Sequence, residues 1–189
     1  MDNEKLNILQ LLIESQEEIF SIRQIALKRK INYKSAYQAV HKLNKEGIVD
    51  ITKHGNTMIC RFNKNFNNSV FVVEHNRLQE LLKNKNFKVI YNRFKGINHQ
   101  FVLLLFGSYA KKTQTKHSDI DLLLIANQGE EIQTQINLLP LPIHLTHIKY
   151  ADFQTMLKSK EFTVVSEAIK HNIILFGIED YYRLISNAG

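Results

Sequence analysis

Hydrophobic positions in the first third of the chain recur every three or four residues, whereas those in the second half form continuous runs. The helical spacing predicts an amphipathic helix over residues 4–15 and further helices over 22–29 and 34–46. Ser21 stands where a helix N-cap is expected, and Gly47 follows the third helix in the usual C-terminal position. The first part of the chain is therefore predicted to be largely helical.

A β-hairpin is predicted directly after the third helix. Two β-prone runs, 48–52 and 57–62, flank a turn of sequence Lys-His-Gly-Asn. Two helices, a tight turn, a third helix and a hairpin form a pattern that resembles a winged helix-turn-helix domain, which we assign to residues 1–65. The resemblance implies that the third helix enters the major groove of DNA and that the hairpin is the wing.

The outward positions of this predicted domain carry basic, amide, hydroxyl and aromatic side chains, which suit contacts to phosphates and base edges. They are Tyr33, Lys34, Ser35, Tyr37, Gln38, His41 and Lys42 on the helix, and Lys53, His54 and Asn56 on the hairpin. The alternative is a domain that only mediates protein contacts or dimerisation. A homodimer is one option, because many winged helices bind palindromic sites as dimers.

The second half alternates predicted strands and helices. An asparagine-rich stretch at 63–70 marks a boundary, and two Lys/Arg-rich helices near 74–84 and 86–95 lead us to assign 66–97 as a basic helical connector. The predicted strands are 101–106, 120–126, 143–147 and 173–176, with helices at 108–112, 130–139, 150–159, 162–171 and 179–185. Residues 98–189 are thus predicted to be an α/β domain with a small mixed sheet, in an α+β chain of two domains.

Charge is distributed unevenly along the chain. The net charge is +7, with balances of +4 for residues 1–65, +7 for 66–118 and −4 for 119–189. A basic region of this kind favours a polyanionic partner such as nucleic acid or a nucleotide, with a solvated lysine-rich surface as the alternative. The run from Arg77 to Lys95 is a candidate for binding either a nucleic-acid acceptor or the DNA backbone.

Several classes of protein are excluded by the composition. No stretch approaches the roughly 20 apolar residues that a membrane helix needs, so no membrane association is expected. The amino-terminal residues fit neither a secretory signal nor a transit peptide. The single cysteine, Cys60, excludes an intrachain disulfide and a cysteine zinc site. These features predict a cytoplasmic protein.

The residues with clear chemical potential lie between two apolar runs. Gly107 and Ser108 follow Phe-Val-Leu-Leu-Leu-Phe, and Asp119 and Asp121 frame the start of Ile-Asp-Leu-Leu-Leu-Ile. A glycine lets a triphosphate approach the backbone, and the free N–H groups of the following turn attract phosphate, as do Lys111 and Lys112 nearby. Two aspartates spaced by two on a strand face the same side and can hold Mg²⁺ or Mn²⁺ together with phosphate oxygens.

This motif is similar to that of the polymerase-β-like nucleotidyltransferase superfamily, and especially to its minimal prokaryotic members, over roughly residues 98–180. The matching positions are Gly107, Ser108, Ala110, Ser118, Asp119, Asp121 and Leu122. The resemblance implies nucleotide binding by the Gly-Ser turn and metal binding by the aspartates. It also implies transfer of a nucleoside monophosphate from ATP or another nucleoside triphosphate to a hydroxyl. Some small members are antitoxins that adenylylate a partner toxin of the HEPN type.

Two positions depart from the family pattern. The family's Arg-Gly is Lys111-Lys112 here, which keeps charge but loses the bidentate geometry of arginine. The third carboxylate of the family is expected on the strand 143–147, where the sequence has His144. Imidazole is a poorer Mg²⁺ ligand than carboxylate but can act as a base. Ordinary alternatives are a strand histidine with a local hydrogen bond, and Asp152, Glu130 or Glu131 as a substitute carboxylate.

The sequence therefore predicts a metal-dependent nucleotidyltransferase that moves a nucleoside monophosphate, AMP by preference, to a protein, small-molecule or RNA hydroxyl. Its candidate catalytic residues are Asp119, Asp121 and His144, and its candidate nucleotide-binding residues are Gly107, Ser108, Lys111, Lys112 and Ser118. The main alternative is a DNA-binding transcriptional regulator whose degenerate nucleotidyltransferase domain only senses nucleotide. A third hypothesis is that the protein is an antitoxin that regulates its own gene and neutralises a HEPN-type toxin.

Overall fold

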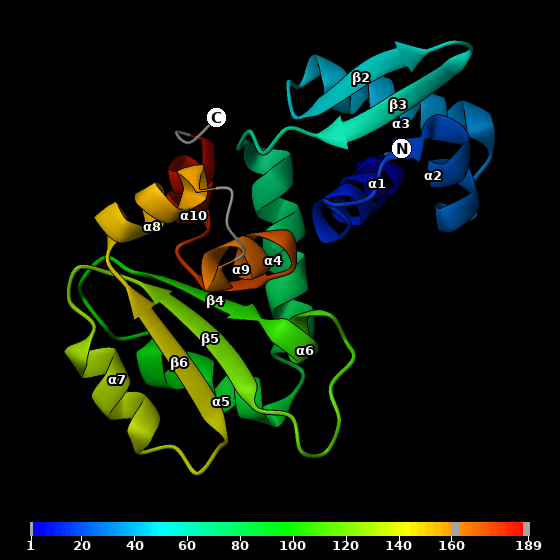
Figure 1. Ribbon diagram of the computed structural model, residues 1–189. Helices are drawn as coiled ribbons and strands as arrows, with labels where there is room; N and C mark the ends of the chain where they lie inside the picture. Colours follow the sequence, from blue (N-terminus) through cyan, green and yellow to red (C-terminus); the bar gives the residue numbers. More distant parts are fainter. Residues whose placement is uncertain (1, 160–162, 187–189) are drawn as a thin grey trace. The chain divides into compact units, whose positions relative to one another are not determined.

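The computed structural model describes residues 2–159 and 163–186, and the chain divides into two compact units, Met1–Val73 and Glu74–Gly189 (Figure 1). The boundary falls within helix α4 (Asn68–Leu81). None of the described helices is long and apolar enough to cross a membrane.

The first unit consists of three helices and a three-stranded antiparallel sheet. Its elements are α1 (Asp2–Glu14), β1 (Phe20–Ser21), α2 (Ile22–Arg29), α3 (Tyr33–Lys45), β2 (Val49–His54) and β3 (Thr57–Phe62), followed by the start of α4. The strand order is β1-β3-β2, so β3 lies in the middle. The predicted helices and hairpin are confirmed as elements. Strand β1 was not predicted, because two residues are too few to show a periodicity.

Local signals define the ends of these helices. The Ser21 hydroxyl accepts a hydrogen bond from the Gln24 N–H while the Gln24 side chain accepts one from the Ser21 N–H, which is a capping box. Asn32 caps α3 through the N–H of Ser35, and Gly47 has φ +73° just after the end of α3. The buried side chains of the three helices and of β3 form the core of this unit.

The second unit is built on a four-stranded mixed sheet. Its remaining elements are α5 (Lys85–Phe94), β4 (Val102–Phe106), α6 (Gly107–Ala110), β5 (Ile120–Ile125), α7 (Glu130–Asn137), β6 (Ile143–Ile148), α8 (Tyr150–Lys158), α9 (Val164–Lys170), β7 (Ile173–Phe176) and α10 (Ile178–Ser186). The strand order is β6-β5-β4-β7, with β5 parallel to β6 and antiparallel to β4. The predicted α+β class and small mixed sheet are confirmed. The start predicted for the helix at residue 162 lies outside the described residues.

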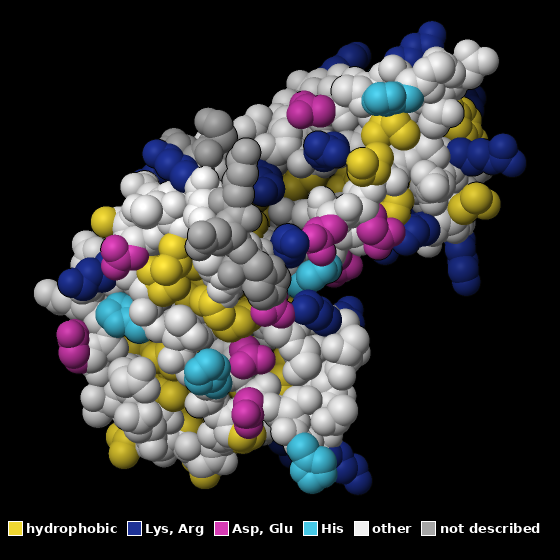
Figure 2. Space-filling view, in the orientation of Figure 1, with side chains coloured by type: hydrophobic (Ala, Val, Ile, Leu, Met, Phe, Trp, Pro, Cys, Tyr) yellow, Lys and Arg dark blue, Asp and Glu magenta, His cyan; other side chains and the backbone are white. Residues whose placement is uncertain are grey.

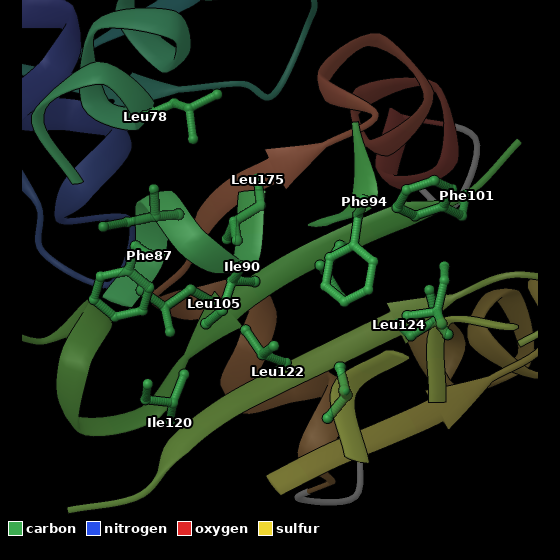
Figure 3. Packing of buried hydrophobic residues seen from close by; sticks show 14 of the residues in the cluster. Leu78, Phe87, Ile90, Phe94, Phe101, Leu105, Ile120, Leu122, Leu124 and Leu175 are labelled. Carbon is green, nitrogen blue, oxygen red and sulfur yellow. The ribbon is translucent and has the colours of Figure 1, made fainter. Parts of the chain in front are cut away.

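Helices cover both faces of this sheet (Figure 1). On one face, Phe87, Ile90 and Phe94 of α5 pack against Leu105, Leu122 and other strand residues, as Figure 3 shows. Helix α7 covers the same face, whereas α8, α9 and α10 lie on the other. Because α5 fills the core, the segment expected to be a connector supplies part of the second unit's packing.

A buried polar network joins α4, α10 and the turn before β7. Glu74 accepts hydrogen bonds from the Tyr182 hydroxyl and from Arg77, both at 2.6 Å. Arg77 also donates to the Asn172 carbonyl, and the Asn172 amide donates to the Tyr181 hydroxyl at 2.9 Å. Burial raises the pKa of Tyr182, and nearby Glu74 adds to the rise. Arg77 therefore belongs to the interior, which corrects its inclusion in the basic run that was a candidate for binding nucleic acid.

Candidate active site

A sharp turn joins the buried strand β4 to the short helix α6. Gly107 opens this helix with φ +67°, a backbone conformation that L side chains rarely adopt. The first N–H groups of a helix have no intrahelical partner, and none of the described side chains caps α6. Ser108 is half-buried within α6, and its carbonyl accepts the Thr113 N–H at 2.9 Å. The turn therefore presents backbone donors beside a residue without a side chain.

Asp121 lies directly against this turn. The antiparallel register pairs Phe106 with Asp121, which brings the carboxylate beside the next residue, Gly107. A Cβ built on Gly107 would overlap Oδ2 of Asp121 and lie 3.1 Å from its Cγ. Only glycine leaves room for the carboxylate here. Gly107 and Asp121, fourteen positions apart in sequence, thus meet in space.

Asp119 and Asp121 differ in how firmly the sheet holds them. Strand β5 begins at Ile120, so Asp121 lies inside the ladder and Asp119 just before it. Ile120, Leu122 and Leu124 belong to the core on the α5 and α7 side, so Asp121 faces the other side. Asp119 is exposed, and the Asp121 side chain is 29 % exposed. Figure 2 shows acidic and histidine side chains gathered on the surface over β5 and β6.

His144 stands opposite Asp121 on the neighbouring parallel strand. The register pairs Asp121 with His144, and Nδ1 of the histidine lies 3.5 Å from Oδ1 of the aspartate. The His144 side chain is 66 % exposed, so solvent or a ligand can reach the ring. The family resemblance of the motif predicts a third carboxylate at this position. His147, three residues farther along β6, instead packs on Gly129, and its Nε2 lies 2.9 Å from the Ala126 carbonyl.

The two lysines after the turn have different surroundings. Lys111 forms an ion pair with Glu167 of α9, with 2.8 Å between Nζ and Oε1. Lys112 is exposed, has φ +58° and makes no ion pair with a described residue. Glu167 was not singled out from the sequence, because a carboxylate on a distant helix carries no local signal of this contact. Ser118 accepts the Thr115 N–H at 2.9 Å and so stabilises the loop before Asp119.

The other acidic residues proposed as substitutes lie at helix starts. Glu130 and Glu131 are in the first turn of α7, and Asp152 is in the first turn of α8, where the helix dipole favours acids. Hydrogen bonds from the N–H groups of Glu130 itself and of Gly129 lower the pKa of the Glu130 carboxyl. Among residues 2–159 and 163–186, no group of three or more His, Cys, Asp and Glu side chains could hold a metal ion. Asp119 and Asp121 therefore remain a predicted pair of metal ligands without a third described carboxylate, cysteine or histidine that completes a cluster.

The candidate DNA-binding residues occupy the surface of the first unit. Tyr33, Lys34, Tyr37, Gln38 and Lys42 are exposed on α3, while Ser35 and His41 are half-buried. The rings of Tyr33, Tyr37 and His41 follow each other along the helix, with centroids 6.2 and 4.2 Å apart. The hairpin residues Lys53, His54 and Asn56 are exposed.

Comparison with known proteins bears on the second unit. A family model described as "Polymerase beta, Nucleotidyltransferase" matches residues 76–181, which is more than half of the chain. No curated protein and no solved structure matches the chain.

Proposed function

Because the chain belongs to the polymerase β nucleotidyltransferase family, we propose that its second unit transfers a nucleoside monophosphate from a nucleoside triphosphate to an acceptor hydroxyl. The observation that carries this proposal is the contact between Gly107 and Asp121, because it brings the turn that we propose to bind phosphate against a carboxylate that we propose to bind the metal. We infer AMP as the transferred group and ATP as its donor.

The residues present fit a divalent cation. Mg²⁺ prefers oxygen ligands and is usually held by one or two carboxylates together with phosphate oxygens and water. Asp119 and Asp121 supply two carboxylates, and neither is paired with a lysine or arginine among the described residues. When bound there, Mg²⁺ or Mn²⁺ neutralises charge on the triphosphate and on the groups that separate during transfer. Aspartates rather than histidine are the metal ligands in this proposal.

The proposed transfer needs only the nucleoside triphosphate and the acceptor hydroxyl as reactants. The acceptor oxygen forms a bond to the α-phosphorus while the bond between that phosphorus and the oxygen bridging to the β-phosphate breaks. Pyrophosphate leaves, held by the N–H groups that follow Gly107, by the Ser108 hydroxyl and by Lys111 and Lys112. His144 accepts the proton of the attacking hydroxyl, and Asp121 stabilises the imidazolium that results.

The deciding experiment compares nucleotide binding by three full-length proteins. MgATP is titrated by calorimetry into the wild type, into Asp119→Asn/Asp121→Asn and into the control Asp152→Asn, whose carboxylate lies at the start of α8. We expect magnesium-dependent binding that is lost only in the double variant. Release of pyrophosphate in a cell lysate supplies the catalytic readout, and label from α-³²P-ATP on a protein band identifies a protein acceptor. Equal binding by all three proteins contradicts the site.

A second candidate function is nucleotide sensing by a DNA-binding regulator. The observation that favours it is the pairing of Asp121 with His144, which leaves two carboxylates where turnover in the family uses three. A sensor binds MgATP and changes its affinity for DNA without releasing pyrophosphate. Measuring DNA affinity with and without MgATP, alongside the pyrophosphate assay, separates this function from transfer.

We propose DNA binding for the first unit in either case. The element order α1-β1-α2-α3-β2-β3 supports a winged helix, with α3 as the recognition helix and the β2–β3 turn as the wing tip. Neutralising Lys34 and Lys53 by glutamine tests this proposal. Each phosphate contact that is lost is expected to reduce the slope of log affinity against log salt by about one. An unchanged slope relative to the control Lys158→Gln points to a protein-binding domain instead.

A further inference from the structure

A long acid-free segment of the chain crosses the second unit. Residues 81–118 contain eight lysines and arginines and no aspartate or glutamate. Helix α5 lies in the first half of this segment, and Lys111, Lys112 and Lys116 follow the proposed phosphate-binding turn near its end. The excess of positive charge in this region is therefore concentrated on two neighbouring pieces of the fold.

Helix α5 separates its apolar and basic residues onto opposite sides. Phe87, Ile90 and Phe94 are buried and point into the sheet, as the labelled side chains in Figure 3 show. The opposite side and the flanking turns are exposed and carry four cations and three amides: Lys85, Lys88, Arg93 and Lys95, with Asn84, Asn86 and Asn92. We refer to these seven residues as the α5 surface.

The cations of the α5 surface are available for an external partner. None of Lys85, Lys88, Arg93 and Lys95 forms an ion pair with a residue in the described part of the chain. Lys83, one residue before the surface, is already paired with Glu80. At the other end Glu131 lies 3.8 Å from His99. Glu80 and Glu131 thus lie near the two ends of the α5 surface, whereas its own four cations have no acidic partner among the described residues.

We propose that the α5 surface binds the phosphate backbone of a nucleic acid without reading its sequence. Lysine, arginine and asparagine are residues that contact phosphates, and phosphate contacts dominate sequence-independent binding. An acidic protein fits less well, because protein interfaces are depleted of lysine and depend on buried aromatic or arginine anchors. Val89 is the one large apolar side chain exposed on α5 itself.

The α5 surface begins close to the phosphate-accepting turn. The ring of Phe87 contacts that of Tyr109 on α6 edge to face, with centroids 5.5 Å apart. Lys85 and Lys88 flank Phe87 in sequence, whereas Arg93 and Lys95 lie toward the other end of the helix. Because a helix rises about 1.5 Å per residue, these two pairs of cations are separated along its axis. A strand bound along α5 therefore has one end beside α6.

The test uses the full chain carrying Lys34→Gln/Lys53→Gln, so that binding by the first unit is weakened in every sample. Into this background we introduce either Lys88→Gln/Arg93→Gln or the control Lys149→Gln/Lys158→Gln, which removes the same charge from exposed positions elsewhere in the second unit. Affinity for a labelled single-stranded RNA and a DNA duplex of unrelated sequence is measured by fluorescence anisotropy over a range of salt concentrations.

We expect the α5 variant to weaken binding to both probes and to reduce the salt slope by about two, one for each phosphate contact, with the control unchanged. Equal slopes in the two variants, or no binding in the shared background, overturn the proposal. Polyglutamate binding is measured in the same proteins as a probe for an acidic protein partner. If the α5 variant loses polyglutamate binding to the same extent as nucleic-acid binding, the proposal is overturned in favour of an acidic protein partner. MgATP binding is expected to be unchanged in the α5 variant, so the result is independent of the proposed transfer.

Discussion

Gly107 and Asp121 are so close that a single Cβ on the glycine would overlap the carboxylate. The antiparallel pairing of β4 with β5 places the Asp121 carboxylate beside Gly107. The positive φ of Gly107 changes the direction of the chain at this same residue. A nucleotide phosphate that binds the turn is therefore necessarily near Asp121. The contact makes glycine at this position a requirement of the proposed site.

Gly107→Ala is expected to abolish MgATP binding and to destabilise the protein by at least about 1 kcal/mol, because alanine is strained at positive φ and displaces Asp121. The control is Gly96→Ala, since a Cβ there meets nothing within 4 Å. Calorimetry reports the binding and thermal unfolding reports the stability. Wild-type affinity in Gly107→Ala would remove the turn from the site.

Lys111 and Glu167 lead to a second prediction about phosphate binding. Because Glu167 competes with phosphate for the Lys111 ammonium, Glu167→Gln is expected to tighten MgATP binding, whereas Lys111→Gln weakens it. The pair is partly exposed, so each effect is about 1 kcal/mol or less, roughly fivefold in affinity. The double variant is expected to resemble Lys111→Gln alone. If Glu167→Gln weakens binding instead, Glu167 positions Lys111 rather than competing for it.

His144 offers a gain-of-function test. The register that pairs it with Asp121 means that His144→Asp adds a third carboxylate beside the proposed metal ligands Asp119 and Asp121. We expect tighter Mn²⁺ binding and faster release of pyrophosphate, since carboxylates bind hard cations better than imidazole does. His144→Asn serves as the matched control, because it removes the imidazole without adding charge. A variant His144→Asp with unchanged Mn²⁺ affinity would place the metal elsewhere.

Acid is expected to destabilise the first unit through Glu46. Burial raises the pKa of its carboxyl, but hydrogen bonds from Lys5 and Ser69 and the nearby positive charge outweigh this and lower the pKa overall. A carboxyl with a lowered folded-state pKa stabilises the fold above its unfolded pKa, which is near 4.3, and the stabilisation is lost as pH falls through the folded value.

Thermal unfolding of the wild type and of Glu46→Gln checks this prediction. Glu46→Gln is expected to lower Tm at pH 7, and the difference from the wild type is expected to shrink at pH 3. The control is Glu4→Gln, whose side chain lies near the start of α1. The same difference between Glu46→Gln and the wild type at both pH values would show that the carboxylate charge does not matter.

The sequence by itself determined the elements and the candidate chemistry. Apolar periodicity located the helices and strands, since burial of one face imposes that spacing, and the Gly-Ser and Asp-x-Asp pattern indicated the family that the matched residues 76–181 confirm. Very short elements, and elements that begin within a polar stretch, were harder to predict from the sequence. Strand β1 has two residues, and α4 begins at Asn68 within a stretch that its asparagines marked as a boundary.

Only the tertiary structure decided which residues meet. Pairing of β5 with both β4 and β6 brings Asp121 against Gly107 on one side and His144 on the other, and no local sequence signal specifies strand order. The contact of Lys111 with Glu167 spans 56 positions. The buried Arg77 and the exposed α5 surface likewise follow from packing, because similar basic residues become interior or exterior according to which helix face the sheet covers.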